Sequence, residues 1–271
     1  MPSPPFPLCP ADAAPREASL RRMRIEMGTA LIIEARASTH AQVSCAVEAA
    51  FAAVARLARL LHPQGPGSDL ARIDAAAPGT AVSIDTATLA VLSFAQHLNI
   101  MSDGLFDPCL PTRPGRVSDL ELEGGAAPRA SARRAVEIDC GGIAKGYAVD
   151  AAVAALRAAG CSAGLVNAGG DLRAFGALPE PLLLRGPQGE YRPLELEDAA
   201  VAVSVRDAAG APSGHRGYYV RAGRAAARRY AAVRASDAMT ADALTKCVLL
   251  GPAGLAARLL ETFGAVSLAG P

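Results

Sequence analysis

The sequence predicts an α+β fold in which mainly antiparallel strands are covered by helices, in two intimately joined subdomains. Apolar residues recur at helical spacing in four separate segments, over residues 43–62, 86–102, 143–159 and from about 238. Between residues 181 and 234 the pattern changes to short apolar runs separated by turn-rich pieces, which is typical of antiparallel strands. A chain of 271 residues is long enough to give both parts an ample core.

The composition argues against several classes of protein. Apolar residues make up 51% of the chain, and 27 Lys and Arg residues nearly balance 26 Asp and Glu residues, so neither nucleic acid nor an anionic membrane is expected as a partner. The six cysteines lie far apart, without a CxxC pair or a Cys/His cluster at zinc spacing, and we expect them to be reduced. No apolar run approaches the roughly 20 residues that span a bilayer.

Residues 1–19 are expected to be a disordered leader, followed by one folded domain over residues 20–271. The leader is rich in proline and alanine, and it lacks the basic start and the apolar core of a signal peptide. Cys9 follows a leucine, but no hydrophobic run precedes it, so the sequence does not favour a lipoprotein anchor. We therefore expect a cytoplasmic protein.

The first folded elements are predicted to be strands and a long helix. Apolar residues alternate through residues 21–36 but are interrupted at Gly28, which predicts two strand pieces or one bulged strand. Thr39 and Gln42 predict a capping box at the start of the helix that runs to His62. We expect His62 to cap the helix end at the surface and not to act in catalysis.

The next elements are predicted to be short, apart from one helix. Residues 68–74 predict a capped helical turn, and residues 80–85 predict a strand. A helix capped by an aspartate is predicted over residues 86–102, and it stops at Gly104. Residues 109–132 contain few apolar side chains and are expected to form a surface connection with one short strand.

Asp107 lies on the loop after this helix, because Pro108 keeps the preceding residue out of the helical region. A loop carboxylate beside a helix end is a candidate ligand group. A simple turn is the commoner role of an Asp-Pro pair, so both interpretations stay open.

The most informative segment is residues 136–150, in which a short apolar strand ends in Asp139, glycines follow at 141 and 142, and Lys145 opens a helix. Glycines let a ligand approach the backbone, the helix start offers unpaired N–H groups, and the lysine adds positive charge, which together suit a phosphate. The opposing interpretation is an ordinary strand, turn and amphipathic helix with a solvated lysine.

Residues 162–176 predict two strands around the glycines at 169 and 170, with Asn167 and Asp171 beside the turn. Such a turn presents backbone N–H groups to an anion, but a tight hairpin uses the same residues.

A helix from about residue 238 places Asp242, Thr245 and Lys246 near one another, opposite an apolar face. An acid, a hydroxyl and an amine in one patch suit a hard cation and a phosphate, whereas a solvated helix face is the ordinary interpretation. A helix from about residue 252 and a last strand within residues 265–270 complete the chain.

Six short blocks, taken together and in order, resemble the FAD:protein FMN transferases, the ApbE-type flavin transferases. The blocks are residues 27–29, 68–74, 102–108, 138–150, 167–172 and 241–246. The resemblance implies that residues 20–271 form an ApbE-type flavin transferase domain, with FAD in a cleft between the two subdomains.

The activity that the resemblance implies is a Mg²⁺-dependent transfer of FMN from FAD to a threonine hydroxyl of a target flavoprotein, with release of AMP. FAD would be the substrate, Mg²⁺ the cofactor, and a flavin-acceptor redox protein the partner. Two other functions use the same binding groups. One is a non-catalytic FAD-binding protein, and the other is a Mg²⁺-dependent FAD pyrophosphatase with water in place of the threonine.

The resemblance also implies roles for individual residues. Six would contact FAD: Met27, Leu105, Phe106, Asp107, Asp139 and Lys145. The metal would be held by the backbone carbonyl of Gly142 and by the side chains of Asp242 and Thr245.

The chain departs from the family pattern at two places. The family has a metal-binding threonine four residues after the aspartate at 242, a position that Lys246 holds here, and Thr245 comes one residue earlier. The family also carries a histidine-containing block before its last strand, whereas residues 217–230 contain neither histidine nor aspartate. His215 is therefore the candidate catalytic base that would activate the acceptor hydroxyl.

Overall fold

The computed structural model describes residues 17–177, 179–205 and 228–269. Residues 206–227 of the region predicted to form short strands, which include the candidate base His215, lie outside this part of the chain, as do residues 1–16 of the expected leader. Ala18 already belongs to the first strand. Within the described ranges, no helix combines the length and the apolar character needed to cross a membrane.

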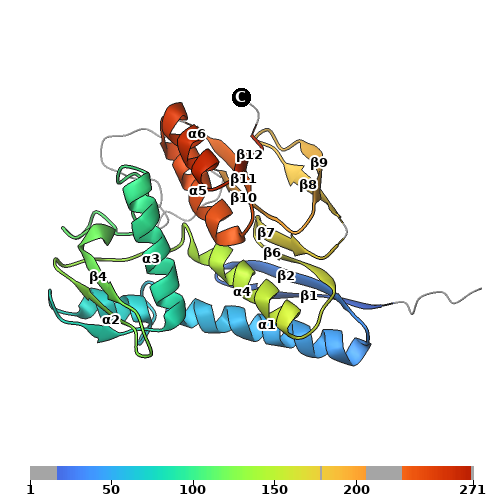
Figure 1. The fold of residues 1–271 in the computed structure, drawn as a ribbon, viewed down its shortest axis with the longest axis horizontal. Coiled ribbons are helices and arrows are strands. Elements are labelled where there is room, and N and C mark those ends of the chain that lie inside the picture. Colours follow the sequence, from blue (N-terminus) through green and yellow to red (C-terminus); the bar gives the residue numbers. More distant parts are fainter. Residues whose placement is uncertain (1–16, 178, 206–227, 270–271) are drawn as a thin grey trace, which may run out of the picture.

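Among the described residues the larger sheet has seven strands, each antiparallel to its neighbours, in the order β1-β2-β6-β7-β10-β11-β12 (Figure 1). The strands are β1 Ala18–Glu26, β2 Thr29–Ala37, β6 Ala163–Ala168, β7 Asp171–Phe175, β10 Ala200–Val205, β11 Tyr230–Ala235 and β12 Val266–Ser267. Strands far apart in sequence therefore meet as neighbours, because β2 pairs with β6 and β7 pairs with β10.

Three helices cover one face of this sheet, with α4 between α1 and α5 (Figure 1). The helices of this part are α1 His40–Leu60, α4 Ala144–Ala158, α5 Ala238–Leu250 and α6 Ala253–Thr262. Ala46 and Ala50 of α1 and Ala148 and Ala152 of α4 are buried, and such small side chains let the two helices approach closely. The hairpin of β8 Glu180–Arg185 and β9 Tyr191–Leu196 packs against the other face through its own apolar cluster.

A smaller subdomain lies beside the end of α1 (Figure 1). Its three-stranded sheet has the order β3-β5-β4. The elements are α2 Asp69–Ala75, β3 Val82–Ser83, α3 Thr86–Met101, a 3-10 helix at Val117–Asp119, β4 Leu120–Glu123 and β5 Arg129–Ala132. One continuous apolar core joins this part to the larger one. The predicted α+β class with two intimately joined subdomains is therefore confirmed.

Several local predictions are confirmed and others are wrong. The interruption at Gly28 is a hairpin turn between β1 and β2. Thr39 accepts a hydrogen bond from Gln42 N at 3.2 Å, but the Gln42 side chain donates to the carbonyls of Ala159 and Gly160, so only half of the predicted capping box forms. The surface connection expected over residues 109–132, with one short strand, contains two strands, β4 and β5. Strand β5 pairs with β4 and also with β3.

Residues 136–139 do not form the predicted strand. Only an isolated antiparallel bridge joins Cys109 to Ile138. The backbone N–H of Ile138 donates instead to both carboxylate oxygens of Asp74, at 3.1 Å each. A side-chain acceptor from α2 therefore replaces the strand partner that the apolar pattern suggested.

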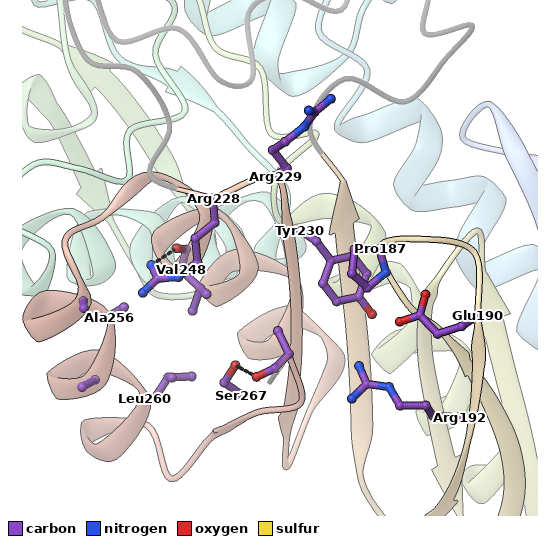
Figure 2. Close-up of a pocket in the computed structure, with 13 residues that line it drawn as sticks. Pro187, Glu190, Arg192, Arg228, Arg229, Tyr230, Val248, Ala256, Leu260 and Ser267 are labelled. Atoms are coloured by element: carbon purple, nitrogen blue, oxygen red, sulfur yellow. Dashed lines mark hydrogen bonds between the residues drawn. The ribbon is translucent and has the colours of Figure 1, made fainter. Parts of the chain in front are cut away.

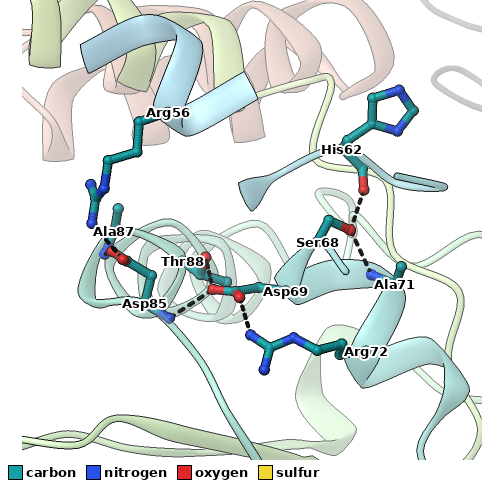
Figure 3. Close-up of polar contacts among 9 residues, drawn as sticks. All are labelled: Arg56, His62, Ser68, Asp69, Ala71, Arg72, Asp85, Ala87 and Thr88. Atoms are coloured by element: carbon teal, nitrogen blue, oxygen red, sulfur yellow. Dashed lines mark hydrogen bonds and ion pairs between the residues drawn. The ribbon is translucent and has the colours of Figure 1, made fainter. Parts of the chain in front are cut away.

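The block at residues 68–74 has a structural role at the junction of three helices (Figure 3). The buried carboxylate of Asp69 accepts hydrogen bonds from Asp85 N at 2.7 Å and Thr88 Oγ1 at 2.6 Å, and it also pairs with Arg72. Asp85 caps α3 and pairs with Arg56 of α1. The block therefore fastens α2 to α3 within the smaller subdomain, and the Asp85–Arg56 pair links α3 to α1.

Candidate functional site

A narrow pocket of about 60 Å³ lies between the loop after α3, the glycine segment before α4, and helix α5. Five residues that the resemblance assigned to the site line this pocket: Leu105, Phe106, Asp107, Asp139 and Gly142. Lys246 and Cys247 of α5 form the opposite wall. Three blocks that are far apart in the sequence thus meet in one place.

Asp107 and Asp139 shape the pocket by forming turns. Asp107 Oδ1 accepts hydrogen bonds from Cys109 N at 2.9 Å and from Val117 N at 3.2 Å, and burial raises the pKa of Asp107 despite these bonds. Asp139 Oδ1 accepts from Gly141 N at 2.9 Å. The turn-forming interpretation of Asp107 is confirmed, and its carboxylate still lines the pocket.

Asp242 lies at the centre of a buried polar contact between α5 and α4. Its Oδ1 pairs with the ammonium of Lys246, and its Oδ2 accepts a hydrogen bond at 3.1 Å from Gly146 N, in the first turn of α4. Asp242 and Thr245 are 0% exposed and Lys246 is 7% exposed, so the interpretation of this patch as a solvated helix face is wrong. The sequence suggested that N–H groups at the start of α4 bind a phosphate. In the structure one of these groups, the N–H of Gly146, donates to the Asp242 carboxylate.

The charges around Asp242 determine how it ionises. Burial raises the pKa of Asp242, but the ammonium groups of Lys145 and Lys246 outweigh this effect and hold the pKa of that carboxyl below its usual range. Asp242 is therefore a carboxylate at neutral pH, and it is paired with a cation from its own helix.

Lys145 pairs with a carboxylate that the sequence did not single out as a site residue. Its ammonium contacts Asp171 Oδ2, at the start of β7, and the Asp171 side chain is 1% exposed. Asp171 Oδ1 is buried without a hydrogen-bond partner among the described residues. Burial and the nearby Asp242 carboxylate raise the pKa of Asp171, against the opposing charge of Lys145. We call Lys145, Asp171, Asp242 and Lys246 the buried charge cluster, in which the last three residues are buried and the Lys145 side chain is 30% exposed.

Met27 lies apart from the pocket, in the β1–β2 turn, with a positive φ of 50°. This turn lies against the glycine turn between β6 and β7, since a Cβ atom added to Gly169 would be 2.2 Å from Thr29 Oγ1. Asn167 Oδ1 accepts a hydrogen bond from Gly170 N at 3.1 Å, which confirms the tight-hairpin interpretation. Asp171 follows directly, so this turn adjoins the buried charge cluster.

The donors expected for Mg²⁺ do not form a divalent metal site. Thr245 Oγ1 donates to the backbone oxygen of Asp242 at 2.6 Å and lies 2.7 Å from Ser204 Oγ, so this hydroxyl belongs to the contact between α5 and β10. A Cβ atom added to Gly142 would lie 3.5 Å from Lys246 Cε, so the lysine side chain occupies the space beside that glycine. The described residues include no group of three or more His, Cys, Asp or Glu side chains that could hold a metal.

Two further acids position the site, and the sequence analysis missed both roles. Asp74 holds the N–H of Ile138 at the start of the glycine segment. Asp150 of α4 accepts hydrogen bonds from Ala238 N at 2.9 Å and Met239 N at 2.8 Å, at the start of α5. Asp74 and Asp150 lie inside the sequence blocks 68–74 and 138–150, but their hydrogen-bond partners are 64 to 89 residues away. No local pattern could have identified these partners.

Asp74 should make stability depend on pH. Burial raises its pKa from 3.8 to about 7, although the Ile138 N–H favours the charged form. A raised carboxyl pKa stabilises the fold fully below the unfolded value, and that stabilisation is lost as the pH rises towards 7. We expect Asp74→Asn to remove this loss, about 1–2 kcal/mol after allowance for partial exposure. Urea unfolding of both proteins between pH 4 and pH 8 measures it. Parallel pH profiles would contradict the assignment.

A larger cavity of about 800 Å³ lies elsewhere, between the β8–β9 hairpin, β11 and α6 (Figure 2). None of the residues proposed from the resemblance lines it. Its polar groups make structural contacts: Arg228 Nη1 donates to Val248 O at 2.8 Å, at the end of α5, and Tyr230 donates to Arg185 O at 2.8 Å. The smaller pocket is therefore the better candidate site, because Gly142 of the glycine segment and Lys246 of α5 both line it.

The chain matches known proteins over most of its length. A model of the ApbE family matches residues 27–114 and 112–267. The FAD:protein FMN transferase of Rhodobacter capsulatus is 29% identical over 177 residues, which are 55% of this chain and 33% of that protein. The match thus spans about a third of the length of this curated relative.

Solved structures share the fold. The apo flavinyl transferase ApbE of Pseudomonas stutzeri has a TM-score of 0.75 at 20% identity, covering 94% of this chain and 92% of that chain. The flavin transferase ApbE of Vibrio cholerae has a TM-score of 0.77 at 18% identity, covering 93% of each chain. At these identities the likeness is one of fold.

Proposed function

Because the chain belongs to the ApbE family, we propose that it transfers FMN from FAD to a threonine hydroxyl of a partner flavoprotein and releases AMP. The relative of Rhodobacter capsulatus carries this type of activity in its name. The observation that carries the proposal is that Lys246 lines the same pocket as Gly142 of the glycine segment, and that its side chain packs beside this glycine.

The proposed reaction breaks the phosphoanhydride bond of FAD and forms a phosphoester bond to the acceptor. The threonine Oγ attacks the phosphorus on the FMN side of the FAD pyrophosphate, and a new P–O bond forms. The bond from that phosphorus to the bridging oxygen breaks, and AMP leaves with this oxygen. The hydroxyl proton passes to a base, for which His215 stays the candidate, outside the described residues.

Charge neutralisation is the main demand of this chemistry, because negative charge develops on the equatorial and leaving oxygens. Lysine ammonium groups supply positive charge, and N–H groups beside glycines can approach phosphate oxygens closely. The proposed reaction does not include Mg²⁺, because the expected donors of Gly142, Asp242 and Thr245 do not form a divalent site.

The size of the pocket limits which part of FAD it would hold. A cavity of about 60 Å³ is much smaller than the roughly 300–1,000 Å³ of a typical ligand pocket, so it would take one portion of the dinucleotide. Phe106 and Leu105 give it an apolar wall, and Lys246 gives it a charged one. Met27, on its turn beside the buried charge cluster, would contact another portion.

Two other functions use the same groups. A non-catalytic FAD-binding protein would bind FAD without cleaving it, and a pyrophosphatase would use water in place of the threonine hydroxyl. The transferase is preferred because of family membership.

The test is incubation of the protein with FAD and a flavin-acceptor domain, followed by mass spectrometry of the acceptor and measurement of AMP. We expect covalent FMN on one acceptor threonine and an equal amount of AMP. An acceptor with that threonine replaced by alanine is the control, and it should remain unmodified.

Other results would select the other functions. AMP and free FMN without modified acceptor would indicate the pyrophosphatase. Bound FAD without AMP under any condition would indicate the binding protein. His215→Ala should lower the transfer rate by roughly 10² if this histidine is the base, without weakening FAD binding.

A further inference from the structure

We infer that the ammonium of Lys246 takes the place of a divalent cation in this chain, so that FAD binds and reacts here without a metal ion. This inference rests on the proposed function, because it concerns the same pocket. It goes beyond that function by naming the group that supplies the positive charge, and it departs from the Mg²⁺ dependence that the family resemblance implied.

The position of Lys246 carries the argument. Its ammonium pairs with Asp242 Oδ1, and its Cε and Cγ atoms would lie 3.5 Å and 3.6 Å from a Cβ atom on Gly142. The Lys246 side chain therefore lies beside Gly142 and contacts Asp242, the two residues that were expected to share the metal. Its ammonium occupies the Asp242 oxygen that a cation would need.

The pairing follows from local structure as well as from the fold. Lys246 comes four residues after Asp242 on α5, so the two side chains lie on the same face of the helix. Both are buried, and a buried ammonium requires a carboxylate partner. Lys246 would therefore leave this position only if another group compensated both charges.

Most of the remaining donors near Asp242 are also committed, and Asp171 Oδ1 is the exception among the described residues. Asp242 Oδ2 receives the N–H of Gly146, and Asp171 Oδ2 receives the ammonium of Lys145. Across the pocket, one oxygen each of Asp107 and Asp139 receives backbone N–H groups. A divalent cation prefers several oxygen ligands with negative charge, whereas the buried charge cluster already contains one ammonium for each carboxylate.

Lys246 also belongs to the pocket proposed for the substrate. Lys246 lines the pocket together with Phe106, Asp139 and Gly142. A pyrophosphate oxygen bound in this pocket would meet the positive charge directly, as it would meet a metal ion in a metal-dependent site. Lysine is a usual phosphate ligand in proteins, where it acts as a point charge.

The first experiment uses the unmodified protein. FAD binding is measured by calorimetry in EDTA and in excess Mg²⁺, and binding of Mn²⁺ alone is followed by electron paramagnetic resonance. We expect the two FAD dissociation constants to agree within about twofold and no Mn²⁺ to bind at Asp242. Loss of FAD binding in EDTA with recovery in Mg²⁺ would overturn the inference, and so would Mn²⁺ binding that Asp242→Asn abolishes.

The second experiment uses Lys246→Thr, which removes the ammonium and adds an oxygen donor. We expect this variant to bind Mn²⁺, and its FAD affinity in EDTA to fall by about tenfold or more and to recover with Mg²⁺. Lys246→Thr combined with Asp242→Asn is the matched control and should bind no Mn²⁺. If folded Lys246→Thr gains no metal binding, the inference fails.

The two proposals fail in different ways. If the protein binds no FAD under any condition, the proposed function fails, while the Mn²⁺ measurements still decide the role of Lys246. If FAD binds only with Mg²⁺, the transferase proposal stands and the inference about Lys246 fails.

Discussion

Gly146→Ala is expected to lower the free energy of unfolding by more than about 3 kcal/mol. A Cβ atom at this position would lie 2.2 Å from the carbonyl oxygen of Ala238 and 2.8 Å from Asp242 Cβ. Both contacts involve packed atoms of α5, one of them backbone, so the two helices would have to separate. Separation would also break the hydrogen bond from Gly146 N to Asp242 Oδ2.

Gly254→Ala is the matched control for this substitution. Gly254 lies in the first turn of α6, and a Cβ atom added there has no neighbour within 4 Å. Alanine is a better helix former than glycine by about 1 kcal/mol, so this variant should be as stable as the wild type or slightly more stable. Urea unfolding measures the free energy of unfolding of Gly146→Ala and of Gly254→Ala. If Gly146→Ala unfolded within about 0.5 kcal/mol of the wild type, the close approach of α4 and α5 would be wrong.

Lys145→Met is expected to destabilise the protein by about 3 kcal/mol and to weaken FAD binding. The substitution leaves Asp171 as a buried carboxylate without its ammonium partner, and Asp171 Oδ1 has no hydrogen bond among the described residues. Removing one partner of a buried ion pair costs more than removing both, because an uncompensated charge remains.

A second substitution separates stability from binding. Asp171→Asn, added to Lys145→Met, should restore most of the lost stability but not the FAD affinity, because the positive charge is still absent. Arg258→Met is the control for loss of a cation from an exposed pair, since Arg258 and Asp103 are 55% and 76% exposed, and it should change stability by less than about 1 kcal/mol. Equal stability of Lys145→Met and Arg258→Met would argue against a buried pair.

The structure groups some of the residues that the resemblance assigned to the site, but not all of them. Five residues chosen from short blocks line one pocket. Met27, Lys145, Asp242 and Thr245 lie outside that pocket, and Thr245 makes a structural contact with Ser204. The roles of individual residues in FAD binding stay predictions, and the assays above test them.

Local signals were sufficient to predict many elements of this protein. Thr39, Ser68 and Asp85 each accept a hydrogen bond from a backbone N–H at the start of a helix, as their positions predicted. The glycines at 169 and 170 form the predicted hairpin turn. These features depend on residues within a few positions of one another, so the sequence contains all the partners.

The chemistry of the site depended on contacts that a sequence pattern does not contain. The helical pattern places Asp242 and Lys246 on a polar face, which predicts that both are exposed to solvent. In the structure both are buried, because the charge of each side chain neutralises that of the other. Gly146 and Asp242 are 96 residues apart, and Lys145 and Asp171 are 26 apart. The sequence by itself determined the fold class, the helix caps, the hairpin turns and the family. Only the tertiary structure decided which charges meet, because burying a charge is favourable only where a partner from elsewhere in the chain compensates it.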